Sequence, residues 1–159
     1  MTGVTTPGGS VITFVAGACV LQAPVRASGA AVPRALIIDD EPGIRFALRR
    51  WFERQAWTVE EAGDGDEALA RLRSTSDDGD DRFDVIVCDV NLPKRSGESL
   101  YRQLEMERPA LTTRIIFSTG DDVLGARPGS LLQRHPWVLQ KPFDMTTLRD
   151  LVGVIARIL

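Results

Sequence analysis

Five residues with chemically useful side chains each stand at the end of a short apolar run. They are Asp39 and Asp40 in LIIDDEP (36–42), Asp89 in VIVCDVNLP (85–93), Thr119 in IIFSTGD (115–121) and Lys141 in VLQKPF (138–143). Such apolar runs are typical of buried strands in a parallel sheet, and the ligand sites of these sheets lie beyond the carboxyl ends of the strands. We therefore expect the five side chains to meet along one rim of a sheet.

The three aspartates would repel one another at such a rim, and burying uncompensated carboxylates is costly, so the cluster calls for cations. Mg²⁺ prefers oxygen ligands and usually binds through one or two carboxylates together with phosphate oxygens. Lys141 adds a positive side chain. His135 is the only histidine, so neither a multi-histidine metal site nor a Ser/His/Asp set is expected, and we expect His135 at the surface. The pattern predicts a magnesium site.

This set of side chains suits phosphoryl transfer, which needs an oxygen nucleophile, a metal and donors for the transferred oxygens. Asp89 is the best-placed nucleophile because it ends the predicted central strand. Thr119 supplies a hydroxyl group, and the neighbouring Gly120 leaves room for a phosphoryl group.

The elements that would position these residues begin at Arg34, where apolar runs start to alternate with amphipathic segments, as in βαβ units. The predicted strands are Leu36–Ile38, Trp57–Glu61, Val85–Cys88, Arg114–Ser118 and Trp137–Leu139. Five such units predict an α/β fold: a doubly wound, flavodoxin-like five-stranded parallel sheet of order 2-1-3-4-5, with helices on both faces.

The sequence predicts some of the helices more clearly than others. The first opens at Pro42 and places Ile44, Ala47, Leu48, Trp51 and Phe52 on one stripe. Pro109 is expected to end the third helix. The fourth is the weakest, because glycine and proline crowd its start and only Ser130–Arg134 has good helical character.

Residues 1–33 carry one charged residue and no sustained period, so we predict a linker or the remnant of an upstream domain, with the folded domain at 34–159. The net charge of -3 and pI near 5.2 disfavour nucleic acid as a partner. The apolar stretch Val11–Val25 is interrupted and lacks a preceding basic region. We therefore expect a cytoplasmic protein that does not associate with membranes. In a cytoplasmic protein we expect Cys19 and Cys88 to be reduced thiols.

The motifs, in this order and spacing, resemble the receiver domain of two-component response regulators from Arg34 to Leu159. The resemblance implies that Asp89 accepts phosphate from a phosphohistidine on a histidine kinase or phosphotransfer protein. It implies Mg²⁺ held by Asp40, Asp89 and the backbone carbonyl of Asn91, with Asp39 supporting the metal through water. Thr119 and Lys141 would bind the phosphoryl oxygens.

In that family, phosphorylation repositions the surface formed by strand four, helix four and strand five, which is the usual output face and the place where a homodimer would form. The family often has Tyr or Phe three residues before the lysine, whereas this chain has Val138. Trp137 is adjacent but belongs to the other face of a strand. An aromatic rotamer switch is therefore not expected here.

Two segments narrow the resemblance. The stretch from Phe117 to Asp144 is similar to receivers attached to hybrid histidine kinases, and Gly8–Phe14 loosely resembles the last strand of a kinase ATP-binding domain. The chain ends soon after its last helix, so the expectation is a signalling phosphoacceptor, not an enzyme, without a DNA-binding or enzymatic output domain.

Two other functions use the same residues. A Mg²⁺-dependent phosphatase with an aspartyl-phosphate intermediate is one, although such enzymes usually place a second Asp where this chain has Asn91. A receiver-fold interaction module that works without phosphorylation is the other. Taken singly, Asp39 and Asp40 could merely cap a helix and Lys141 could be a surface lysine.

Overall fold

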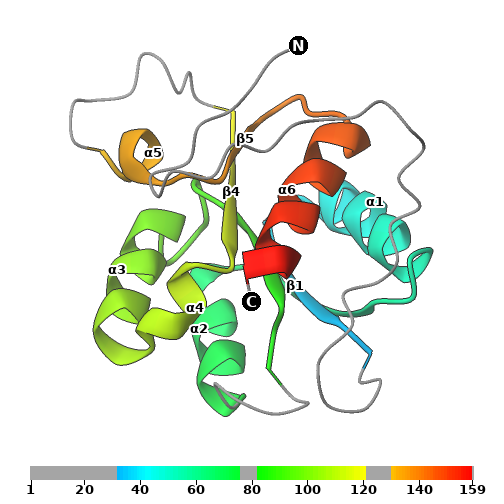
Figure 1. The fold of residues 1–159 in the computed structure, drawn as a ribbon. Helices are drawn as coiled ribbons and strands as arrows, with labels where there is room; N and C mark the ends of the chain where they lie inside the picture. Colours follow the sequence, from blue (N-terminus) through cyan, green and yellow to red (C-terminus); the bar gives the residue numbers. More distant parts are fainter. Residues whose placement is uncertain (1–31, 76–81, 121–129, 159) are drawn as a thin grey trace, which may run out of the picture.

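A computed structural model describes residues 32–75, 82–120 and 130–158 (Figure 1). Its elements, in chain order, are β1 (Arg34–Ile38), α1 (Pro42–Glu53), β2 (Thr58–Ala62), α2 (Gly65–Ser74), β3 (Val85–Asp89), α3 (Gly97–Glu107), α4 (Pro109–Thr112), β4 (Ile115–Thr119), α5 (Leu131–Arg134), β5 (Val138–Gln140) and α6 (Met145–Ile158). The five strands form one parallel sheet of order β2-β1-β3-β4-β5. The predicted fold class and strand order are confirmed.

Strand residues alternate between two hydrophobic cores, one on each face of the sheet. Leu36 and Ile38 of β1 pack into the core beneath α2, α3, α4 and α5, whereas Ala35 and Ile37 pack into the core beneath α1 and α6. Figure 1 shows these two helix groups on opposite sides of the sheet. A strand buried on both faces must be apolar throughout, which explains the uninterrupted runs in the sequence.

The stripe predicted for α1 is mostly confirmed. Leu48 and Phe52 are buried, Ile44 and Trp51 are half-buried, and Ala47 is exposed. Two large buried side chains anchor the helix, since burying each is worth about 1.5–3 kcal/mol.

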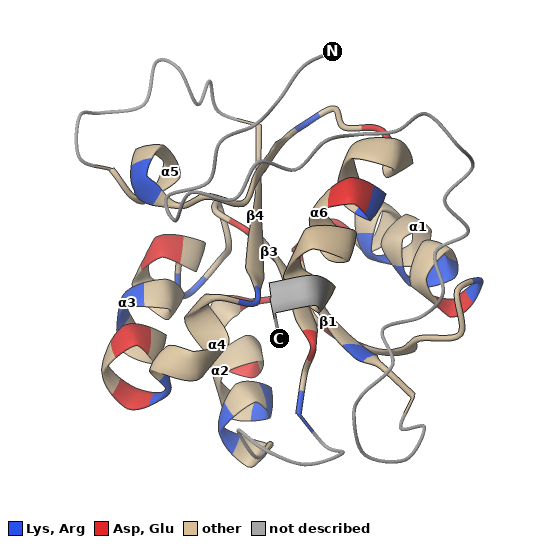
Figure 2. Cartoon of the chain, viewed as in Figure 1, with Lys and Arg blue, Asp and Glu red and all other residues tan. Residues whose placement is uncertain are grey.

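The edge strand β2 is stabilised by charge. Glu60 pairs with Arg34 and with Arg71 of α2, while Glu61 pairs with Arg49 of α1 at 2.9 Å. Figure 2 shows acidic and basic residues interspersed over α2 and α3. Charged side chains on an edge strand discourage pairing with another chain.

Several predicted boundaries need correction. Strands β2, β4 and β5 each begin one residue later than predicted, at Thr58, Ile115 and Val138. Strand β1 begins two residues earlier than predicted, at Arg34. Pro109 does end α3, but it also opens the short helix α4, which the sequence pattern did not predict. Proline suits a first helical turn because its missing N–H would have no partner there.

The helix predicted to be the weakest is α5, which has four residues and begins at Leu131. Residues 121–129, which precede it, lie outside the described residues. The linker or remnant predicted for residues 1–33 falls almost wholly outside them too, and so do Cys19 and Gly8–Phe14.

The surface location predicted for His135 is wrong. The residue is 8% exposed, and its ring packs edge-on against Phe117 at 4.9 Å and Tyr101 at 5.3 Å between ring centroids. The Trp137 amide donates to Nδ1 at 3.2 Å, which makes Nε2 the protonated nitrogen. Burial holds the pKa of His135 below its ordinary value.

Within the parts of the chain that the structure describes, no helix is both long enough and apolar enough to cross a membrane.

Candidate phosphoacceptor site

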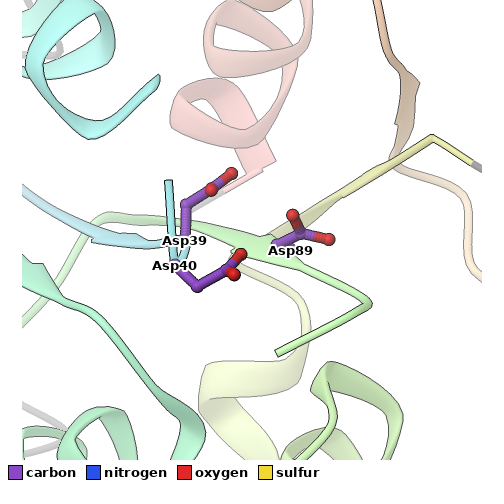
Figure 3. A group of neighbouring side chains, drawn as sticks. All are labelled: Asp39, Asp40 and Asp89. Carbon is purple, nitrogen blue, oxygen red and sulfur yellow. The ribbon is translucent and has the colours of Figure 1, made fainter. Parts of the chain in front are cut away.

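The carboxyl ends of β1, β3, β4 and β5 bring the predicted residues together. Asp39, Asp40 and Asp89 each offer a carboxylate oxygen, and the three oxygens lie within 4.8 Å of one another (Figure 3). Asp39 and Asp89 are 1% and 5% exposed, while Asp40 is exposed. The cluster therefore has two buried carboxylates and one, that of Asp40, open to solvent.

Asp39 is oriented by the chain that follows it. The Glu41 amide donates to its Oδ1 at 2.9 Å, and the Arg45 side chain donates to its backbone carbonyl at 2.6 Å. Glu41, which precedes α1, makes no side-chain capping bond to that helix. Arg45 was not anticipated, because nothing in its spacing distinguishes it from the other arginines of α1.

Asp89 uses its two oxygens differently. The Asn91 amide donates to Oδ1 at 2.9 Å, which closes a local turn after β3. Oδ2 accepts a hydrogen bond from Lys141 at 2.5 Å. The side chain is thus held at the rim from both sides.

Lys141 bridges the two buried aspartates. Its Nζ lies 2.9 Å from Asp39 Oδ2 and 2.5 Å from Asp89 Oδ2, with Glu41 3.6 Å away. Burial alone would lower the pKa of Lys141, but the hydrogen bonds to Asp89 and Asp39 outweigh it, so the pKa is raised. The pKa of Asp39 is raised mainly by burial. Lys141 is charged and supplies part of the compensation that the aspartates need.

Thr119 is fully buried at the end of β4, beside Gln140 of β5. Its carbonyl accepts a hydrogen bond from the Lys141 amide at 2.7 Å, just before the cis Lys141–Pro142 peptide. A methyl group at the neighbouring Gly120 would meet none of the described residues within 4 Å. Thr119 and Lys141 therefore share one edge of the site.

These residues fit a divalent cation. Three carboxylates face one lysine, so the cluster keeps an excess of negative charge, and all its ligand atoms are hard oxygens. Mg²⁺ matches that set of donors.

The sequence matches the family model of the response regulator receiver domain over residues 35–153. The chain belongs to this family. A relative, the probable transcriptional regulatory protein TcrX of Mycobacterium tuberculosis, is 32% identical over 120 residues, which cover 76% of this chain and 47% of TcrX. The chain thus spans about half the length of the curated relatives it matches.

Solved receiver domains share the fold. A response regulator receiver protein of Pseudomonas putida aligns with a TM-score of 0.65 and 27% identity, covering 79% of this chain and 98% of that one. The response regulator TrrA of Thermotoga maritima, solved with Mg²⁺ and BeF, aligns with a TM-score of 0.64 and 22% identity, covering 78% and 99%.

The receiver domain is the phosphoacceptor module of two-component signalling, and such domains bind Mg²⁺ at an acidic pocket and are generally not classed as enzymes. In this receiver the acidic cluster, Thr119 and Lys141 meet as the sequence predicts. Val138 and Trp137 pack into the cores on opposite faces of the sheet, also as predicted. The structural glycine of the site was missed: a methyl group at Gly97 would overlap the Asp89 carbonyl oxygen.

Proposed function

We propose that this receiver accepts a phosphoryl group on Asp89 from the phosphohistidine of a histidine kinase or phosphotransfer protein. The single observation that supports this most strongly is the set of charged side chains around Asp89. Its buried carboxylate contacts Lys141, and one of its oxygens lies within 4.8 Å of an oxygen of each of two further carboxylates. A merely structural aspartate would not need such neighbours.

The phosphoryl transfer forms one bond and breaks one. An Asp89 oxygen attacks phosphorus and the phosphorus–nitrogen bond breaks. The donor histidine keeps the electron pair of that bond and, carrying a proton on its other ring nitrogen, leaves as neutral imidazole. Asp40, Asp89 and the backbone carbonyl of Asn91 would hold Mg²⁺, with Asp39 supporting it through water, and the ion would neutralise charge on the transferred oxygens.

Lys141 and Thr119 would then bind the phosphoryl oxygens. Lys141 already contacts the acceptor oxygen Oδ2, so a phosphoryl group there would draw its ammonium group away from Asp39. The bond between the Lys141 amide and the Thr119 carbonyl links the ends of β4 and β5. A shift at either residue would thus reach both strands.

Output would pass to another protein across the surface of β4, α5 and β5, which is also where we place a possible homodimer. Val138 is half-buried against the core in β5, so the change would be carried by backbone and packing and not by an aromatic side chain at that position. We further propose a cytoplasmic location, and a receiver similar to those of hybrid histidine kinases.

Beryllofluoride binding tests the proposal. With Mg²⁺ present, ¹⁹F NMR of the wild-type protein should show a bound beryllofluoride resonance that is lost in Asp89→Asn. Asp150→Asn, which changes an exposed carboxylate of α6, is the matched control and should keep it. A resonance that persists in Asp89→Asn would contradict the assignment, and turnover of simple phosphate esters would favour the phosphatase alternative.

A further inference from the structure

The loop that joins β3 to α3, residues 90–96, packs against the start of α2, a helix that contributes none of the site residues described above. We call it the β3–α3 loop. It follows Asp89 and carries Asn91, whose backbone carbonyl is a proposed metal ligand, so the inference below rests on the proposed function.

Both ends of the β3–α3 loop are fixed beside the site. The Val90 amide donates to the Ser118 carbonyl at 3.0 Å, and the Gly97 amide donates to the Val90 carbonyl at 2.9 Å. Gly97 also lies so close to the Asp89 carbonyl that no side chain fits. The loop therefore starts and ends at Asp89.

The tip of the loop packs against the first residue of α2. A methyl group at Gly65 would lie 2.7 Å from Arg95 Cβ and would overlap the Arg95 carbonyl oxygen. The Gly65 amide lies 3.5 Å from the Pro93 carbonyl oxygen. Glycine at this position permits a backbone-to-backbone approach that any other residue would prevent.

Two ion pairs flank this contact. Lys94 Nζ lies 2.6 Å from Asp64 Oδ2, and Arg95 Nε lies 3.0 Å from Asp66 Oδ1. The other oxygen of Asp64 accepts from the amides of Asp66 and Glu67 at 3.0 and 2.9 Å and so caps α2. The hydrogen bond from Lys94 is the largest cause of the lowered pKa of Asp64. One carboxylate thus joins the helix to the loop.

Lys94 is held in an unusual backbone conformation. Its φ of 63° lies in the left-handed region, which residues other than glycine and asparagine seldom adopt. Such a conformation persists only where the surroundings enforce it. Here Asp64 pairs with the Lys94 side chain, and Gly65 leaves room for the backbone of the next residue, Arg95.

We propose that the N-terminus of α2 positions the β3–α3 loop for metal binding. The Asp64–Lys94 ion pair and the Gly65–Arg95 contact hold the loop in the one shape that presents the Asn91 carbonyl to the acidic cluster. Asp64, Gly65 and Lys94 are positioning residues, because they act on the metal only through the loop.

Binding of Mn²⁺, followed through the EPR signal of the free ion, tests the proposal on the full chain. Lys94→Asn removes the cation while keeping a residue that tolerates the left-handed region, and Asp64→Asn keeps the capping oxygen. Each should raise the Kd for Mn²⁺ about threefold, which is the size expected when a partly exposed ion pair is lost. The double variant should be no worse than either single one, because both changes remove the same pair. Gly65→Ala should raise the Kd further.

Glu98→Gln is the matched control, since it breaks the exposed Glu98–Arg102 pair of 2.7 Å on α3 without touching the loop. Its Kd should equal that of the wild type. Urea unfolding without metal separates the alternatives: a purely structural role would lower stability while leaving the Kd of the folded protein unchanged. An unchanged Kd in Lys94→Asn and Asp64→Asn would overturn the proposal whether or not Gly65→Ala folds. Wild-type protein that fails to bind Mn²⁺ would instead overturn the proposed function.

Discussion

At the scale of single residues, Lys141 contacts carboxylates that a bound metal ion would also contact. Its ammonium group contacts Asp39 and Asp89, two of the three carboxylates of the cluster. A bound divalent cation and Lys141 therefore compensate the same charges, and each weakens the need for the other. Without metal the cluster would depend on the lysine, and with metal bound it would depend on it less.

Lys141→Met should expose this competition. Without metal, the free energy of unfolding should fall by about 1–3 kcal/mol, because two largely buried carboxylates lose their cation. Added Mg²⁺ should restore more stability in the variant than it adds to the wild type. Thermal unfolding with and without Mg²⁺ measures both quantities, and a smaller Mg²⁺ effect in Lys141→Met would contradict this interpretation of the cluster.

Ser118 offers a stability test close to the site. Among the described residues, its buried Oγ has no hydrogen-bond partner. A buried hydroxyl without a partner costs free energy, so Ser118→Ala should stabilise the domain by up to about 1 kcal/mol. Urea unfolding checks the sign, and a loss of more than that amount would show that the hydroxyl is satisfied in solution.

His135 gives the domain a dependence on pH. Because burial lowers its pKa, the folded state binds fewer protons than the unfolded state below the unfolded value of 6.5. Its contribution to stability is thus complete above pH 6.5 and is lost as the pH falls from 6.5 through the folded pKa. Protonation would also remove Nδ1 as the acceptor for the Trp137 amide.

We expect wild-type stability to fall between pH 7.5 and 5.5 more than that of His135→Phe, which keeps an aromatic ring in the same core. Urea unfolding at the two pH values gives the difference. Equal losses in the two proteins would assign the pH dependence to other groups.

At the scale of elements, the strand-end residues could be predicted from sequence because a parallel sheet buried on both faces leaves an unmistakable apolar run. Helix α4 could not, since Pro109 is equally compatible with the end of one helix and the start of another. The burial of His135 was also hidden, because it depends on Tyr101 and Phe117 from distant elements. The close contact of Gly97 with Asp89 likewise exists only after β3 and α3 have packed.

Two glycines in helices should respond oppositely to alanine. A methyl group added at Gly43, in the first turn of α1, would meet none of the described residues within 4 Å, so Gly43→Ala should stabilise the domain by about 0.5–1 kcal/mol. Gly97→Ala would overlap the Asp89 carbonyl and should destabilise by about 1–3 kcal/mol. Paired unfolding experiments decide the matter, and the same sign for both variants would be inconsistent with the geometry of the β3–α3 loop.

At the scale of the whole molecule, the fold explains why residues far apart in sequence can act together. Asp39 and Lys141 are separated by most of the domain, yet β1 and β5 end on the same rim and their side chains meet at 2.9 Å. The parallel sheet, which places the carboxyl ends of the strands on one rim, follows from the βα pattern in the sequence. The loop contacts that shape the rim do not.

The central claim is that Asp89 is the residue that carries phosphate. The most direct measurement is mass spectrometry of the intact protein after incubation with acetyl phosphate and Mg²⁺, followed by peptide mapping of the modified chain. The account predicts the mass gain of a single phosphoryl group, located at Asp89, dependent on Mg²⁺ and absent from Asp89→Asn. A phosphoryl group located on another residue, or no mass gain from a folded, Mg²⁺-binding protein, would contradict it.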